Sequence, residues 1–217
     1  MDGAVAAAMR EFHGHVDSRA ARLEARDSRF LCPVPCSGCC VANVFFVTAL
    51  EFMYLCEHVR ETLSQERVAA VVSCAREQVA VCGIEEAARL DSGDPGRGEH
   101  PVLRQPCPLL ESDRCLAYPA RPTPCRFFGR SRFKSGEMNL CEIIERRLGD
   151  GAAPVRLPIV ENYSRHLARV LARHLGPGGL SDVEPFVNVS TLPVFIAETE
   201  FREEAVVSVC AGITLGL

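Results

Sequence analysis

Apolar side chains recur at helical intervals in four stretches of the chain. Over residues 4–25 the intervals are four, three, four and seven, which places Val5, Met9, Phe12, Val16 and Leu23 on one stripe of a helix. We expect this stripe to dock on the body of the protein. Further helices are predicted over about 48–63, 64–82 and 158–175.

Capping residues mark where these helices begin and end. Thr48 and Glu51 have the spacing of a capping box, so a helix should begin at Thr48. Ser64 is the predicted cap of the next helix, and Gly176 with Pro177 should end the last one. The apolar tail from residue 181 to 217 contains two prolines and shows no readable period.

Shorter elements are predicted between the helices. The run 44–47 is apolar and should be extended, and 101–117 should form a small hairpin that bends at 111–114. Residues 91–99 have loop composition, and a second turn is expected at 134–137. A short helix should follow Pro122, and an amphipathic stretch should run from Cys141 to Leu148.

These elements predict a mainly α fold with little β structure, in which helices pack around an irregular cysteine-rich metal centre beside one short hairpin. We expect three parts: an amphipathic helix over 1–29, a cysteine-cluster metal-binding domain over 30–148, and a helix with a tail over 149–217 that packs on the same domain.

Composition limits the classes of function. The chain has 217 residues, of which 47% are hydrophobic and 24% charged, so it can bury a core without disulfide bonds. A net charge of −4 gives no reason to expect a nucleic-acid partner. No signal peptide and no apolar run of about 18 residues are visible, so we expect a cytoplasmic protein without a membrane partner.

Eight of the twelve cysteines fall into two islands. Such density in a reducing compartment favours metal ligation over disulfides. Thiolates hold zinc or iron–sulfur clusters, four to a site, so the set suits one or two sites. The candidate ligands are Cys32, Cys36, Cys39, Cys40, Cys107, Cys115, Cys125 and Cys141.

The other four cysteines lie outside the islands. Cys56, Cys74 and Cys82 lie on predicted helices, and we interpret them, together with Cys210, as small buried hydrophobic residues.

The adjacent pair Cys39 and Cys40 carries a geometric consequence. Neighbouring side chains diverge, so both sulfurs cannot easily reach one metal. We therefore expect one of them to reach a second metal, to bridge two metals or to pack elsewhere. Pro33, Pro35 and Gly38 should keep this island out of regular helix.

The spacing of Cys32, Cys36 and Cys39 also matches the triple that holds the cluster in radical S-adenosylmethionine enzymes. The strand–helix alternation that those enzymes share does not follow here.

The second island carries a longer pattern. It reads Cys-Pro-Leu-Leu from Cys107, Cys-Leu-Ala-Tyr from Cys115, and Arg-Pro-Thr-Pro-Cys-Arg-Phe-Phe from Arg121. With the first island, it resembles the YkgJ-type cysteine-cluster family, known by its CxxCxxCC motif and described as zinc- or iron-chelating. The resemblance covers about Phe30 to Ile144, and the gap after Cys32 holds three residues where the family usually has two.

The resemblance implies metal chelation by the eight cysteines named above. It also implies that Tyr118, Arg121 and Arg126 lie around the sulfurs or the cofactor. Arginines gather along this region, and arginines near thiolates would offset their negative charge and could donate hydrogen bonds to sulfur.

Two hypotheses of function follow. The first is a metal-binding protein that holds an iron–sulfur cluster or zinc in a redox, carrier or structural role. The alternative is a cluster-dependent, methylase-like enzyme that modifies a peptide or protein side chain and could use S-adenosylmethionine. A protein or peptide partner could bind to the apolar stripe of the first helix.

Overall fold

The computed structural model describes residues 1–33, 36–82, 106–149, 156–183 and 189–206. The chain divides into two compact units, each built from two segments that are distant in sequence. Unit 1 comprises Met1–Cys39 and Thr123–Asp182, and unit 2 comprises Cys40–Pro122 and Val183–Leu217. The structure is mainly helical with a few short strands, which confirms the predicted fold class. The predicted division at residues 29 and 148 stays a prediction.

Unit 1 begins with the predicted amphipathic helix, α1 (Gly3–Arg26). The Asp2 side chain accepts a hydrogen bond of 2.8 Å from the amide of Ala4 and so caps the helix. All five residues of the predicted apolar stripe are buried. Asp27 follows α1 and caps the short 3₁₀ helix η1 (Ser28–Phe30).

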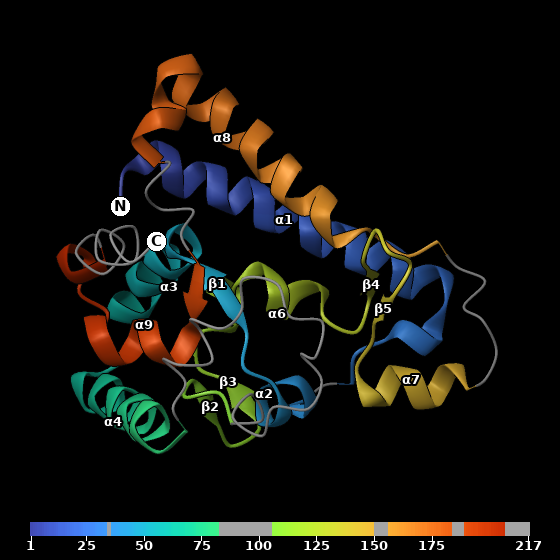
Figure 1. Ribbon diagram of the computed structural model, residues 1–217, viewed down its shortest axis with the longest axis horizontal. Coiled ribbons are helices and arrows are strands. Elements are labelled where there is room, and N and C mark those ends of the chain that lie inside the picture. The colour runs from blue at the N-terminus through green and yellow to red at the C-terminus, as the bar shows by residue number, and fades with distance from the viewer. Residues whose placement is uncertain (34–35, 83–105, 150–155, 184–188, 207–217) are drawn as a thin grey trace. The chain divides into compact units, whose positions relative to one another are not determined.

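The second segment of unit 1 returns to α1. It contains α6 (Thr123–Phe127), the hairpin of β4 (Ser131–Arg132) and β5 (Met138–Asn139), and α7 (Glu142–Leu148). The last helix, α8 (Val160–Val183), runs back along α1 (Figure 1). Gly176 interrupts α8 with a φ of 75°, where the sequence predicts a helix end, but helical turns resume beyond it.

A small hydrophobic core joins these elements of unit 1. Leu23 of α1 and Phe30 of η1 pack with Ile144 and Leu148 of α7 and with Leu157, and partly buried Leu140 and Cys141 lie against them. The segment that carries the first cysteine island therefore follows directly from a residue in this core.

Unit 2 is held by strands from the two ends of its sequence. β1 (Phe46–Thr48) pairs antiparallel with β6 (Val189–Thr191), and α3 (Ala49–Thr62), α4 (Gln65–Cys82) and α9 (Leu192–Thr199) surround them. Phe52 stacks on Phe195 with ring centroids 4.9 Å apart. In the part of the tail that the structure describes, Leu192, Phe195 and Phe201 are among the buried apolar residues.

A hairpin lies where the sequence predicts one. β2 (Leu110–Glu111) pairs with β3 (Arg114–Cys115), and Ser112 and Asp113 form the bend with positive φ angles. The 3₁₀ helix η3 (Tyr118–Ala120) follows. The prediction of a single hairpin is wrong, because the described residues form three two-stranded sheets. Strands of two or three residues are too short for a readable alternation.

The first cysteine island is only partly a loop. Cys39 and Cys40 lie in the short helix α2 (Gly38–Ala42), although the two prolines and Gly38 predict irregular backbone. The prolines precede the helix and do not interrupt it, which is where proline is tolerated. The predicted loop 91–99 lies outside the described residues.

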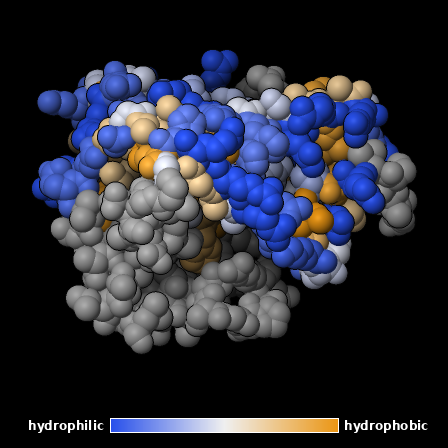
Figure 2. Space-filling model, turned by 90° about the horizontal axis from the view of Figure 1, so that it is seen from above, coloured by the Kyte–Doolittle hydropathy of each residue, from blue (hydrophilic) through white to orange (hydrophobic). Residues whose placement is uncertain are grey.

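No described helix has the length and apolarity to cross a membrane. Figure 2 shows hydrophilic residues over most of the described surface on the face that it presents.

The capping box of α3 forms as predicted and should stabilise unit 2. The amide of Glu51 donates to Thr48 Oγ1 at 3.2 Å, and the amide of Thr48 donates to Glu51 Oε2 at 3.2 Å. We predict that Thr48→Ala lowers the free energy of unfolding by about 1 kcal/mol, because the Glu51 amide loses its acceptor. Urea unfolding followed by circular dichroism measures this loss.

The control is Thr62→Ala at the exposed end of the same helix, where the hydroxyl only donates to the carbonyl of His58. It should change the stability by less than about 0.5 kcal/mol. Equal losses in the two variants would contradict a specific role for the cap.

Candidate metal centre

Three thiols of the first island interact in unit 1. Burial, and then the proximity of Cys36, raise the pKa of Cys32 to about 11; a hydrogen bond with Cys36 and the proximity of Cys39 act in the same direction. The hydrogen bond places the Cys32 and Cys36 side chains next to each other, whereas Cys39 acts on Cys32 through its charge alone. Whether the three cysteines share a site, as their spacing predicts, stays a prediction.

Arg130 opposes this effect by favouring the Cys32 thiolate. Its side chain is 12% exposed, is paired with Glu24 of α1, and donates from Nη2 to the carbonyl of Arg126 at 3.2 Å. Its Nε is buried and has no hydrogen-bond partner among the described residues. A buried cationic donor of this kind fits an anionic acceptor nearby, as a thiolate would be.

Cys141 approaches the backbone of the same unit. Gly129 has a φ of +81°, and a Cβ at this position would lie 3.1 Å from Cys141 Sγ. Both the backbone conformation and the close approach require glycine. Gly129 therefore lets the Cys141 thiol sit against the turn that leads from α6 to Arg130.

Cys36 lies on the side of α2 that meets α7. A Cβ at Gly38 would be 3.8 Å from Cys36 Sγ and 3.6 Å from Ile143 Cδ1. Cys141 directly precedes α7, as the N-cap of the helix that carries Ile143. The fifth candidate ligand of unit 1, Cys125, lies half-buried in α6.

Unit 2 holds the other three candidate ligands. The amide of Cys107 donates to the carbonyl of Cys40 at 2.6 Å, and the carbonyl of Cys107 accepts from the amide of Leu110 at 2.9 Å. Leu110 pairs with Cys115 across the β2–β3 hairpin. The hairpin thus places the backbones of Cys40, Cys107 and Cys115 in one neighbourhood.

Gln78 of α4 supports this segment. Its side chain is 8% exposed, and Nε2 donates to the carbonyl of Pro106 at 2.6 Å and to Cys74 Sγ at 3.5 Å. The sequence does not single out Gln78, because a polar residue on a helix is usually solvated.

Tyr118 and Arg121 contact each other in unit 2. The Arg121 guanidinium lies 3.9 Å from the centroid of the Tyr118 ring, which is a cation–π contact. Tyr118 is 56% exposed to solvent. Their placement around a cofactor stays a prediction.

Arg126 has a structural position in unit 1. It is 2% exposed, and Nη1 donates to Asp17 Oδ2 of α1 at 2.5 Å. The arginine whose charge acts on Cys32 is Arg130, four residues further on. In the sequence, both belong to one arginine-rich region. In the structure they have different neighbours, and Gly129 lies between them in the chain.

Cys56 of α3 and Cys74 of α4, both predicted to be buried, differ in burial. Cys56 is fully buried in α3, and burial raises its pKa to about 12, so it behaves as the core residue that we expected. Cys74 is half-buried, and burial, then the negative charge of Glu77, raises its pKa.

Within the described residues, no group of three or more His, Cys, Asp or Glu side chains has an arrangement that could hold a metal ion. The predicted metal centre is therefore not shown. Side-chain interactions between island cysteines are seen at Cys32 in unit 1, and in unit 2 backbone contacts link Cys40, Cys107 and Cys115.

No family model, curated protein or solved structure matches the chain. The resemblance of the cysteine pattern to the YkgJ-type family stays a prediction.

The Arg126–Asp17 pair should stabilise unit 1. We predict that Asp17→Asn lowers the free energy of unfolding by about 2 kcal/mol, because it leaves the buried guanidinium without its counter-charge. This figure is below the ~3–5 kcal/mol of a fully buried pair, since Asp17 is 42% exposed and partly screened by water. Urea unfolding measures the difference.

Glu11→Gln is the matched control on the same helix. Glu11 pairs with Arg173 and His174 at an exposed position. Glu11→Gln should therefore lower the free energy of unfolding clearly less than Asp17→Asn does. If Asp17→Asn is no more destabilising than Glu11→Gln, the Arg126 charge does not depend on Asp17.

Proposed function

We propose that this chain binds zinc or an iron–sulfur cluster through the thiolates of its two cysteine islands, in a structural, carrier or redox role. The observation that carries the proposal is the interaction of Cys32 with Cys36, Cys39 and the nearly buried cation of Arg130. Packing of a core does not require three interacting thiols next to a charge.

The chemistry of this group supports a thiolate metal site. Neighbouring thiols do not repel one another while they are protonated, but each thiolate makes it harder to ionise the next. The raised pKa of Cys32 reflects burial together with this effect. A bound cation would reverse this, because it stabilises every thiolate that it contacts. Arg130 offsets a further part of the negative charge, and its unpartnered Nε could donate to sulfur.

The unit boundary bears on the number of metal positions. It falls between Cys39 and Cys40, so unit 1 holds five candidate ligands and unit 2 holds three. This division agrees with the expectation that the adjacent sulfurs serve different positions. We therefore propose more than one metal position.

The alternative of a methylase-like enzyme remains open as a prediction. No contact among the described residues favours it over metal binding.

Metal content tests the proposal. We predict that anaerobically purified protein contains stoichiometric zinc or iron, and that Cys39→Ser and Cys125→Ser each lower this content, because each variant removes one thiolate ligand. Elemental analysis gives the metal. Acid-labile sulfide with absorbance near ~400 nm distinguishes an iron–sulfur cluster from colourless zinc.

Cys74→Ser is the matched control, since Cys74 also lies half-buried but outside both islands. It should keep the metal content of the unaltered protein. A metal-free protein, or equal loss in all three variants, would contradict the proposal.

The raised pKa of Cys32 predicts a pH dependence of metal affinity. With a pKa of about 11, this thiol is protonated at neutral pH and must lose its proton to become a ligand. The apparent affinity for Zn²⁺ should therefore rise as pH increases from about 6.5 to about 8, about tenfold per pH unit for each proton released. Competition with a chromophoric chelator at several pH values measures the slope.

Cys32→Ser should reduce that slope by about one proton, because the serine hydroxyl has no thiol proton to release. An affinity that does not change with pH would show that the ligands are not protonated thiols.

A further inference from the structure

Unit 1 has a second feature that is independent of its cysteines. Two adjoining cavities of about 480 Å³ and 310 Å³ lie between α1 and the beginning of α8. Arg19, Pro158, Ile159 and Asn162 line both, so the two cavities form one continuous groove. We call it the arginine groove.

One wall of the arginine groove comes from α1. Arg19, Arg22 and Arg26 line it at intervals of three and four, which places the three side chains on one face of the helix. Like charges at this spacing repel one another. Their presence on one face therefore disfavours the folded state unless an anion offsets them.

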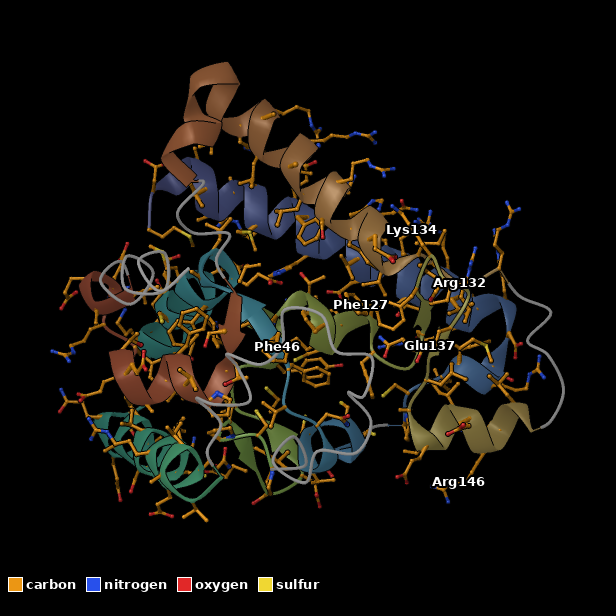
Figure 3. All side chains as sticks on the ribbon, in the orientation of Figure 1. Phe46, Phe127, Arg132, Lys134, Glu137 and Arg146 are labelled. Atoms are coloured by element: carbon orange, nitrogen blue, oxygen red, sulfur yellow. The ribbon has the colours of Figure 1, made fainter. Side chains whose placement is uncertain are left out.

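The other wall comes from the second segment of unit 1. Arg165 and Arg169 of α8 line the smaller cavity, and Arg132 of β4 and Arg156 line the larger one. Figure 3 shows Arg132 and Lys134 on the β4–β5 hairpin, near the point where α8 begins. A backbone hydrogen bond fixes the hairpin next to the start of α8: the amide of Arg132 donates to the carbonyl of Pro158 at 2.9 Å.

Seven arginines line the groove, and no carboxylate among the described residues lines either cavity. None of the seven forms an ion pair with another described residue, although the charge of Arg132 acts on Glu161.

The acidic residues of α1 are engaged elsewhere. Asp17 pairs with Arg126 and Glu24 pairs with Arg130, while Glu11 pairs with Arg173 and His174. None of these partners lines the groove. At the start of α8, Glu161 accepts from the amide of Lys134 at 3.0 Å.

The pKa of a histidine at the groove is lowered by burial and by the positive charges around it. The rings of His15 and His166 have centroids 3.9 Å apart, and both residues line the smaller cavity. Burial lowers the pKa of His15, and the charges of His166, Arg19 and Arg22 lower it further. The charge of Glu11 opposes this lowering but does not outweigh it, so the pKa of His15 stays below its ordinary value.

We propose that the arginine groove binds a small molecule that carries two or three linked phosphate groups. Arginine presents paired N–H donors that match phosphate oxygens, and unpaired arginines on two facing walls can contact several phosphates at once. The volume lies in the range of small-molecule sites. The net charge of −4 does not favour a nucleic acid.

Calorimetric titration of the full-length protein with inorganic tripolyphosphate tests the proposal. We expect one site per chain and an affinity that falls several-fold between about 50 and about 200 mM salt, because charge pairing is screened. Pyrophosphate should bind and monophosphate should bind at least about tenfold more weakly, since it makes fewer charge-assisted hydrogen bonds. Comparing tripolyphosphate with ATP shows whether a nucleoside adds affinity.

Arg19→Gln is the decisive variant, because Arg19 lines both cavities and is exposed, so its loss should not affect folding. It should weaken tripolyphosphate binding by about tenfold, the cost of one charge-assisted contact. Arg22→Gln should have a similar effect. Arg173→Gln on α8 is the control, since Arg173 pairs with Glu11 outside the groove and should leave the affinity within about twofold.

The Cys39→Ser variant separates this site from the proposed metal, because tripolyphosphate also chelates metal ions. Unchanged binding in that variant supports the groove, whatever its metal content. Three results would overturn the proposal: no heat of binding, equal affinity in Arg19→Gln and the unaltered protein, or tighter binding of a DNA duplex or a polyglutamate peptide than of tripolyphosphate.

Discussion

Two ion pairs on one side of α1 organise unit 1. Asp17 binds the buried Arg126, and Glu24 binds Arg130, so α1 holds both α6 and the turn that follows it. The two acids are seven residues apart, which places both side chains on one face of α1. Because Arg126 is almost completely buried, this contact cannot be lost without leaving a charge in the interior.

The same arrangement separates the remaining charges of α1. By helical geometry, Arg19, Arg22 and Arg26 lie roughly opposite to Asp17 and Glu24. The acids are used by α6 and its turn, and the arginines are left along the groove beside α8. A chain with a net charge of −4 therefore contains a strongly positive groove, because net charge averages over faces that tertiary contacts keep apart.

The ion pair of Glu24 also links the fold to the cysteines. It holds Arg130 where its charge acts on Cys32, and the glycine before Arg130 admits the Cys141 thiol. The cation and the thiols are thus brought together by packing against α1. This explains why an arginine with few polar contacts of its own is kept nearly buried at this place.

Local sequence determined the elements whose signals lie within a few residues. The stripe of α1, the capping box of Thr48 and Glu51, and the bend at Ser112 and Asp113 each depend on neighbours along the chain, so they could be predicted. The interactions of Cys32 with Cys36 and Cys39 likewise join residues that are close in sequence.

Tertiary structure decided what depends on distant residues. The pairing of β1 with β6 and the burial of the tail join opposite ends of unit 2, and strands of three residues carry no signal for it. Arg130, and not Arg126, acts on Cys32, and the arginines of α8 face α1. Both facts follow from how the helices pack. Sequence spacing sets which residues share a face, and only packing sets what that face meets.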